Sequence, residues 1–203
     1  MFTYSPIHYS EEEEEKEEEE SIHTSERRVY GLNRRTRIFD VSFFGKSITT
    51  TVTFERREIR RWIYSNLYYN RRNRYNLVVG LGVQWLPFSS DDPAETLQIC
   101  IGTRCLIIQL SHTRYLPKFL QRFLDNEKIT FVGIWIIRSF HYHNIDYLLG
   151  NESSSGSMEN LIRDYLGFKG VRKDEIVGRS NWNAKNLSVD QVQYATVDAH
   201  ASF

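Results

Sequence analysis

The sequence predicts a single α/β domain whose mixed β-sheet is flanked by helices. Among its 203 residues, 40% are hydrophobic and 14% aromatic, which is enough apolar surface for one sizeable core. Several short β-rich runs follow one another and then alternate with helical patterns, as in a sheet that contains both parallel and antiparallel strands. The last third of the chain has helical rather than strand periodicity.

Residues 1–28 are predicted to be an acidic disordered tail, and residues 29–203 to be the folded domain. Residues 11–20 read EEEEEKEEEE, and residues 1–25 show no apolar period, so they bury too little surface to offset the entropy of ordering. This Glu tract holds nine of the 26 acids and one of the 26 bases, so the rest of the chain carries a net charge of +8. A basic domain favours an anionic partner such as nucleic acid.

The first folded elements are predicted to be a β-hairpin and an amphipathic helix. Residues 37–54, RIFDVSFFGKSITTTVTF, contain two β-rich runs around Gly45 and Lys46. Residues 54–67, FERREIRRWIYSNL, follow a helical period. The arginines lie mostly on one face. The apolar residues share another face, which is formed by Ile59, Trp62, Ile63 and Leu67.

Residues 78–85, VVGLGVQW, predict a strand that is buried on both faces for most of its length. Because side chains alternate along a strand, Gly82 and Gln84 point to one face and Leu81 and Val83 to the other. The two runs that follow, TLQICIG and RCLIIQL, predict a hairpin with a two-residue turn at residues 102–103.

The two cysteines, Cys100 and Cys105, could face each other across this hairpin, but we expect them to be reduced, packed thiols. No signal peptide opens the chain, and no apolar stretch approaches the ~20 residues that a membrane span requires. We therefore expect a protein of the nucleus or cytoplasm without a membrane partner.

A strand–helix–strand unit is predicted next, with a helix over residues 116–127 and a buried strand over residues 128–135. Helices are then predicted over residues 158–168 and from Ser188 onward, because Ser188 and Gln191 have capping-box spacing. The helical pattern continues to the last residue, so we expect a domain that is truncated at its C-terminus.

Four segments match a known family in order and in approximate spacing: YNLVVGLGVQW, TLQICIGTRCLIIQL, FVGIW and LSVDQVQYATVDAHASF. Over about residues 37–203 the chain resembles the Werner-type 3′–5′ exonuclease domains, particularly the small single-domain plant proteins. These are DEDDy exonucleases of the ribonuclease H-like superfamily. The resemblance implies a ribonuclease H-like 3′–5′ exonuclease fold, with five or six strands in the sheet.

The resemblance also implies a chemistry that needs four carboxylates and a tyrosine. In the family, two Mg²⁺ or Mn²⁺ ions activate a water and stabilise the leaving 3′ oxygen, and the tyrosine orients the water. The last motif is intact as Tyr194 and Asp198. Gly82 and Gln84 occupy the positions of the first two acids, and the third falls at or near Ser139. Since Asp198 is the one surviving metal-binding acid, we expect no tight binding of either metal.

These positions lead to a main hypothesis and two alternatives. The main hypothesis is a catalytically impaired exonuclease-like protein, a pseudoenzyme, that retains nucleic-acid binding. One alternative is an active 3′–5′ exonuclease on RNA or DNA that uses the depleted site. Asp91, Asp92 and Glu95 are the nearest acids, but they lie six or more residues beyond Trp85 in a loop. The other alternative is a decaying gene copy. Tyr194 and Asp198 would be ordinary helix residues if the site has no role.

A cluster of seven arginines is predicted to bind nucleic acid, and the nearby Tyr68, Tyr69 and Tyr75 can stack on the bases of single-stranded RNA or DNA. The alternatives are a solvated basic helix and an intramolecular contact with the acidic tail. The arginines are Arg56, Arg57, Arg60, Arg61, Arg71, Arg72 and Arg74.

Deleting residues 1–25 is expected to tighten binding to single-stranded RNA or DNA, because the tethered Glu tract competes with phosphates for the arginines. The effect should be largest at low salt, since the Debye length is ~10 Å at 0.1 M, and should vanish near roughly 0.5 M. Fluorescence anisotropy of both proteins at two salt concentrations measures it. Unchanged affinity at low salt means that the tail does not compete.

Overall fold

The computed structural model describes residues 22–29, 35–72, 77–86, 94–113, 115–133, 163, 167 and 174–202. Of the predicted features, Arg74, Tyr75 and Ser139 lie outside the described residues, as does most of the helix expected over residues 158–168. Within the described part, no helix is long and apolar enough to cross a membrane.

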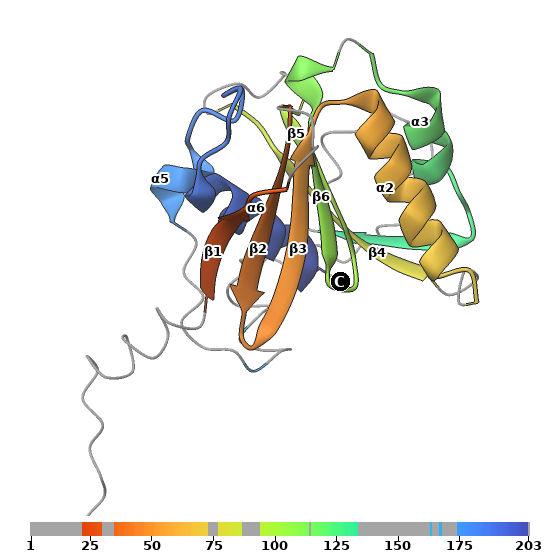
Figure 1. The fold of residues 1–203 in the computed structure, drawn as a ribbon, viewed down its shortest axis with the longest axis horizontal. Coiled ribbons are helices and arrows are strands. Elements are labelled where there is room, and N and C mark those ends of the chain that lie inside the picture. Colours follow the sequence, from red (N-terminus) through yellow and green to blue (C-terminus); the bar gives the residue numbers. More distant parts are fainter. Residues whose placement is uncertain are drawn as a thin grey trace, which may run out of the picture.

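Seven strands form one mixed sheet in the order β1-β2-β3-β6-β5-β4-β7 (Figure 1). The pairs β3–β6 and β4–β7 are parallel and the other neighbours are antiparallel, which confirms the predicted mixed sheet. The expected number of five or six strands is too low, because β1 falls in the segment predicted to be tail. The strands are β1 (Ile22–Arg27), β2 (Thr36–Phe43), β3 (Lys46–Thr53), β4 (Leu77–Gln84), β5 (Thr96–Ile101), β6 (Arg104–Gln109) and β7 (Ile129–Gly133).

Helices cover both faces of the sheet. Helices α2 (Arg56–Tyr69) and α3 (Lys118–Leu124) pack on one face and α6 (Val189–Ala201) on the other (Figure 1). Strand β6 shows the division, because Leu106 and Ile108 belong to the core under α2, whereas Ile107 packs with α6. The short α5 (Glu175–Gly178) and the 3₁₀ turn η1 (Leu110–His112) complete the described elements.

The helices begin and end close to the predicted positions. The inner face of α2 buries Ile59 and Ile63, as its apolar period predicts. Helix α6 has the predicted capping box. The backbone N–H of Gln191 donates to Ser188 Oγ at 3.1 Å, and the backbone N–H of Ser188 donates to Gln191 Oε1 at 2.9 Å. The turn between β5 and β6 places Gly102 at φ +57°, a conformation that glycine adopts without strain.

The predicted tail is wrong at its end, because residues Ile22–Arg27 form β1 instead of extending the tail. This edge strand pairs along its full length with β2. Its side chains are mostly exposed, so its sequence shows no apolar alternation. Ion pairs to β2 hold it instead: Arg27 with Asp40, and Glu26 with Arg37 at 2.8 Å. A deletion that tests the tail should therefore end at residue 20.

The expectation of reduced thiols is also wrong. Cys100 and Cys105 are directly opposed in the β5–β6 register, with Cα atoms 4.3 Å apart, and are joined as a disulfide. The two-residue turn causes this pairing, because it fixes which residues of the two strands stand opposite each other. Both cysteines are fully buried beside Val197 and Ala199 of α6.

Trp182, in the loop before α6, holds that helix on the sheet. It is fully buried against Val192 and Ala195 of α6 and Ile107 of β6. Its indole N–H donates to the carbonyl of Gly178 at 3.0 Å. The large ring and its satisfied N–H make it the anchor of this segment.

Replacing Trp182→Ala is expected to lower the free energy of unfolding by about 3–5 kcal/mol, because it leaves a cavity between α6 and the sheet. Urea unfolding followed by circular dichroism measures the loss. The matched control is Ile176→Ala, whose side chain is 82% exposed and whose removal should change stability by under about 0.5 kcal/mol. Equal effects of the two substitutions would show that Trp182 does not anchor α6.

Candidate functional site

The candidate site lies where the end of β4 meets α6. As predicted, Gly82 and Gln84 lie on one face of β4, and this is the face that α6 covers. The side-chain amide of Gln84 donates a hydrogen bond to Asp198 Oδ2 at 3.1 Å, and both residues are only 8% exposed. The structure therefore brings together one surviving and one degenerate position of the predicted site through a direct neutral-to-charged hydrogen bond.

Gln98 fills the space beside Gly82. These residues are register partners in the antiparallel β4–β5 pair, and a Cβ added at Gly82 would stand 2.8 Å from Gln98 Oε1. Gln98 is fully buried, and its amide donates to Thr96 Oγ at 2.6 Å. Its Oε1 accepts no hydrogen bond from the described residues. An aspartate at position 82 therefore requires Gln98 to move.

Tyr194 lies one turn before Asp198 on α6, as the motif predicts. Its ring packs against Trp182 with centroids 6.0 Å apart, and its hydroxyl lies against Gly178 of α5. Asp198 is buried in the helix, with its backbone carbonyl accepting a hydrogen bond from the Ser202 hydroxyl at 2.9 Å. Their catalytic role stays a prediction.

The residues of this site are poor ligands for the two metal ions used by the family that the chain resembles. Two divalent cations need several hard, negatively charged oxygens, but here the amide N–H₂ of Gln84 points at Asp198. Among the described residues, no group of three His, Cys, Asp or Glu side chains could hold a metal ion. Glu95, next to β5, is buried, and its backbone N–H donates to the Gln84 carbonyl at 2.8 Å.

One titratable group near the site was not predicted from the sequence. His200, two residues after Asp198, is buried, and its ring meets Phe43 edge-on with centroids 5.8 Å apart. Burial lowers the pKa of His200, the charge of Lys46 lowers it further, and a backbone hydrogen bond with Gly102 opposes the shift. This environment favours the neutral imidazole.

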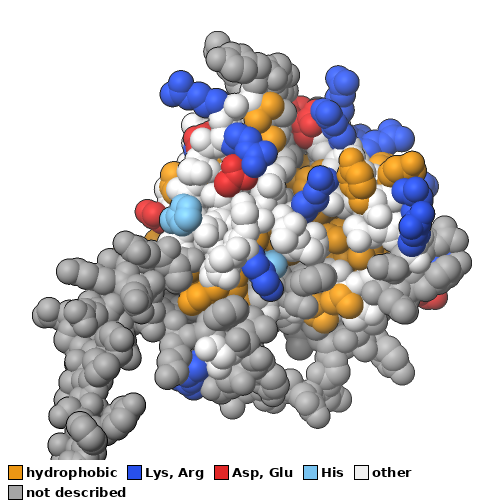
Figure 2. Space-filling model, turned by 60° about the horizontal axis from the view of Figure 1, so that its bottom comes forward, with side chains coloured by type: hydrophobic (Ala, Val, Ile, Leu, Met, Phe, Trp, Pro, Cys, Tyr) orange, Lys and Arg blue, Asp and Glu red, His pale blue; other side chains and the backbone are white. Residues whose placement is uncertain are grey.

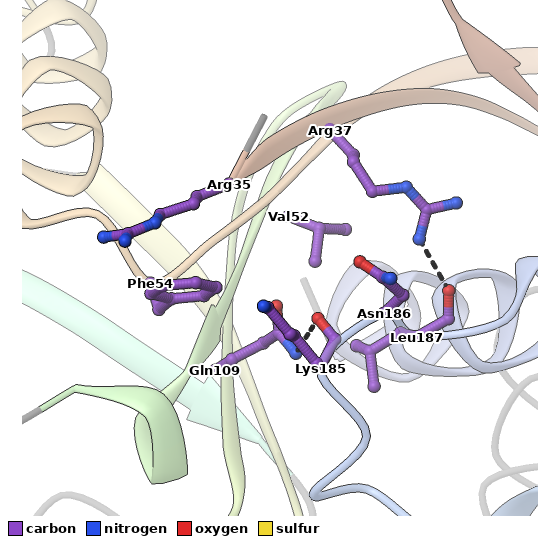
Figure 3. Close-up of a pocket in the computed structure, with 8 residues that line it drawn as sticks. All are labelled: Arg35, Arg37, Val52, Phe54, Gln109, Lys185, Asn186 and Leu187. Atoms are coloured by element: carbon purple, nitrogen blue, oxygen red, sulfur yellow. Dashed lines mark hydrogen bonds between the residues drawn. The ribbon is translucent and has the colours of Figure 1, made fainter. Parts of the chain in front are cut away.

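A small polar cavity opens on the α6 side of the sheet, near the ends of β3 and β6 (Figure 3). Its volume of about 20 Å³ holds about one water and no nucleotide. Arg35 pairs with Glu55 at 2.9 Å, and Arg37 binds Glu26 and the Leu187 carbonyl, so ion pairs offset both charges. The hydrogen bond from Arg37 lowers the pKa of Glu26. The cavity is therefore structural and offers no second candidate site.

The predicted arginines lie on the other side of the sheet. Arg56, Arg57, Arg60 and Arg61 are exposed on the outer surface of α2, and Arg71 and Arg72 follow it. Figure 2 shows Lys and Arg side chains beside hydrophobic ones, a class that there includes Tyr, over the right of the molecule, where Figure 1 shows α2. Since α2 and α6 cover opposite faces, the structure separates the arginines from Gln84 and Asp198.

The chain is similar in sequence to known 3′–5′ exonucleases. A protein of Arabidopsis thaliana named 3′–5′ exonuclease is 26% identical over 201 residues, covering 89% of this chain and 69% of that protein. The bifunctional 3′–5′ exonuclease/ATP-dependent helicase WRN of Mus musculus is 27% identical over 143 residues, covering 61% of this chain and only 10% of that protein. The chain is a relative of the 3′–5′ exonucleases. No family model matches it.

Solved structures confirm the fold of this exonuclease relative. Escherichia coli RNase D, an exoribonuclease, superposes with a TM-score of 0.51 at 16% identity, over 68% of this chain and 40% of that chain. The catalytic core of RRP6 from Trypanosoma brucei gives 0.50 at 17% identity, over 75% and 44%. The predicted ribonuclease H-like exonuclease fold is therefore confirmed.

Replacing Asp198→Ala is expected to lower the free energy of unfolding by about 1–3 kcal/mol, because it leaves the buried Gln84 amide without its acceptor. Asp198→Asn keeps an acceptor oxygen and should lose less. Thermal unfolding of the unmodified protein should be the same in MgCl₂ and in EDTA, since the hydrogen bond needs no metal. A melting temperature that rises with Mg²⁺ and no longer does so in Asp198→Ala would contradict this account.

Proposed function

We propose that this exonuclease relative binds nucleic acid and is catalytically impaired. One observation carries the proposal: Gln84 occupies a position where the resembling family has a metal-binding acid, and its amide is hydrogen-bonded to Asp198. The carboxylate oxygen that would face a metal accepts a hydrogen bond from a neutral group instead. Gly82 contributes no side chain on the same face, and Gln98 occupies the space beside it.

The charge balance supports the impairment. Two dications bring four positive charges to a site that offers Asp198 and the neutral amides of Gln84 and Gln98. Within the described part of the chain, Asp198 is the one carboxylate at the positions of the family's acids, whereas two-metal catalysis uses several carboxylates to hold the ions in place. The third acid position, Ser139 in the sequence, adds no negative charge.

Nucleic-acid binding rests on charge and on the relatives. The chain without its Glu tract has a net charge of +8, and the arginines on and after α2 are exposed. The similar proteins are named as exonucleases, a class of enzyme that acts on nucleic acid. A fold of this class can retain electrostatic binding after its chemistry is lost, because phosphate contacts do not need the metals.

Glu95 favours a second candidate, an active 3′–5′ exonuclease. This carboxylate is buried next to the strand end that carries Gln84, and its Oε2 has no hydrogen-bond partner among the described residues. An active enzyme of this kind would lose its activity on Glu95→Gln. The main proposal expects no metal-dependent activity to lose.

The unmodified protein is expected to leave a 5′-labelled single strand intact in Mg²⁺ or Mn²⁺. Restoring the acids by Gly82→Asp, Gln84→Glu and Ser139→Asp should give 3′–5′ shortening once Gln98→Ala has made room beside position 82, where a Cβ would otherwise meet Gln98 Oε1 at 2.8 Å. Gel electrophoresis of the labelled strand measures it. The fourfold variant should exceed the threefold variant, and Gln98→Ala alone should stay inactive.

Two outcomes are informative in the same assay. Degradation by the unmodified protein that is abolished by Asp198→Ala overturns the impairment, and its further loss on Glu95→Gln identifies the second candidate. Degradation that persists in Asp198→Ala comes from a contaminating nuclease, and the preparation is then repurified and assayed again.

A further inference from the structure

The outer surface of α2 carries arginines along its first half and tyrosines along its second half. Arg56, Arg60, Tyr64 and Tyr68 follow one another at i, i+4 spacing and therefore lie in one row. Tyr64, Tyr68 and Tyr69 are 53%, 63% and 66% exposed. These five residues and Arg71 define the arginine–tyrosine face.

Each of these three tyrosines has a guanidinium group over its ring. Arg60 lies over the Tyr64 ring at 5.5 Å, Arg71 over Tyr68 at 4.3 Å, and Arg104 of the β5–β6 hairpin over Tyr69 at 4.9 Å. A planar guanidinium stacks on an aromatic face, and so does a nucleobase. The rings are thus held ready beside positive charges.

The arginines in the first half of α2 repel one another. Arg56 with Arg60 and Arg57 with Arg61 are like-charge pairs at i, i+4, which destabilise a helix. Arg56 and Arg57 also lie in the first turn, where the helix dipole disfavours cations. Glu58 is the acid within α2 and pairs with Arg61 at 3.7 Å. One acid offsets only part of the repulsion among four arginines, whereas an anionic partner would relieve it.

From these observations we infer that the arginine–tyrosine face binds single-stranded nucleic acid, with arginines on the phosphates and tyrosines stacked on the bases. The inference rests on the proposed nucleic-acid binding and assigns its location. The row from Arg56 to Tyr68 is about 18 Å long at 1.5 Å per residue. This is the length of about five stacked nucleotides at 3.4 Å each. Single strands fit because the base faces of a duplex are already stacked.

The arginine–tyrosine face is separate from the candidate site around Gln84 and Asp198. The inner side of α2 packs on the sheet face opposite to α6, so a strand bound on the outer side of α2 does not contact Gln84 or Asp198. Binding on this face therefore holds a strand without presenting its end to the exonuclease-like site.

Fluorescence anisotropy of labelled oligo(dT) and oligo(U) with the full chain tests the inference. Tyr68→Ala and Tyr64→Ala should each weaken binding by about fivefold to a hundredfold, and Tyr68→Phe should bind as the unmodified protein does. Replacing Arg56 and Arg60 with Gln should reduce the slope of log K against log salt by about 1.4, because each phosphate contact contributes about 0.7. These side chains are exposed, so the variants should fold, as circular dichroism can verify.

One control makes the test specific. Arg179→Gln removes one positive charge directly after α5, on the α6 side of the sheet, and should leave affinity and slope unchanged. The inference is overturned if the tyrosine variants bind like the unmodified protein or if Arg179→Gln weakens binding as the α2 variants do. It is also overturned if inorganic polyphosphate displaces the oligonucleotide equally well from the unmodified protein and from Tyr68→Ala. Nuclease activity would overturn the impairment and not this surface, whereas a lack of binding to either oligonucleotide overturns both nucleic-acid proposals and not the impairment.

Discussion

The packing of α6 on the central strands is the contact on which the rest of the structure depends. Trp182, Val192 and Ala195 bury one part of the helix against β2, β3 and β6, and Val197 and Ala199 bury the next part beside the Cys100–Cys105 hairpin. The buried Thr50 and Thr196 hydroxyls share a hydrogen bond of 3.0 Å across the same contact. This apolar packing places Asp198 within reach of Gln84, so the geometry of the site is a consequence of the core and needs no ligand to form.

At the site, β4 and α6 are joined by a direct hydrogen bond between an amide and a carboxylate. Where the resembling family joins carboxylates of a strand and a helix through cations, this chain joins an amide and a carboxylate directly, and the single buried charge gains a hydrogen bond. Gln98 then fills the space that Gly82 leaves open on the same face. The proposed replacement of the family's acids is therefore consistent with the packing of Gln98 and with the hydrogen bonding of Gln84.

Much of this could be predicted from the sequence, because it depends on local periodicity. The shared face of Gly82 and Gln84 follows from strand alternation, the start of α6 from Ser188 and Gln191, and the buried side of α2 from its apolar period. Strand β1 was missed because its mostly exposed side chains carry no such signal and its pairing depends on ion pairs with β2. The contacts of Gln84 with Asp198 and of Gln98 with Gly82 join separate segments, and only the three-dimensional register reveals them.

The separation of α2 from α6 by the sheet gives the two surfaces different constraints. The inner side of α2 rests on Leu81, Val83 and their neighbours, which point away from Gly82 and Gln84 on the same strand. A substitution at Gly82 or Gln84 therefore changes the α6 side and leaves the support of α2 unchanged, because alternate residues of one strand belong to different cores. Loss of carboxylates at the site is thus compatible with an intact arginine-bearing helix, and the energetic cost of keeping like charges along that helix is understandable if its outer face has a function of its own.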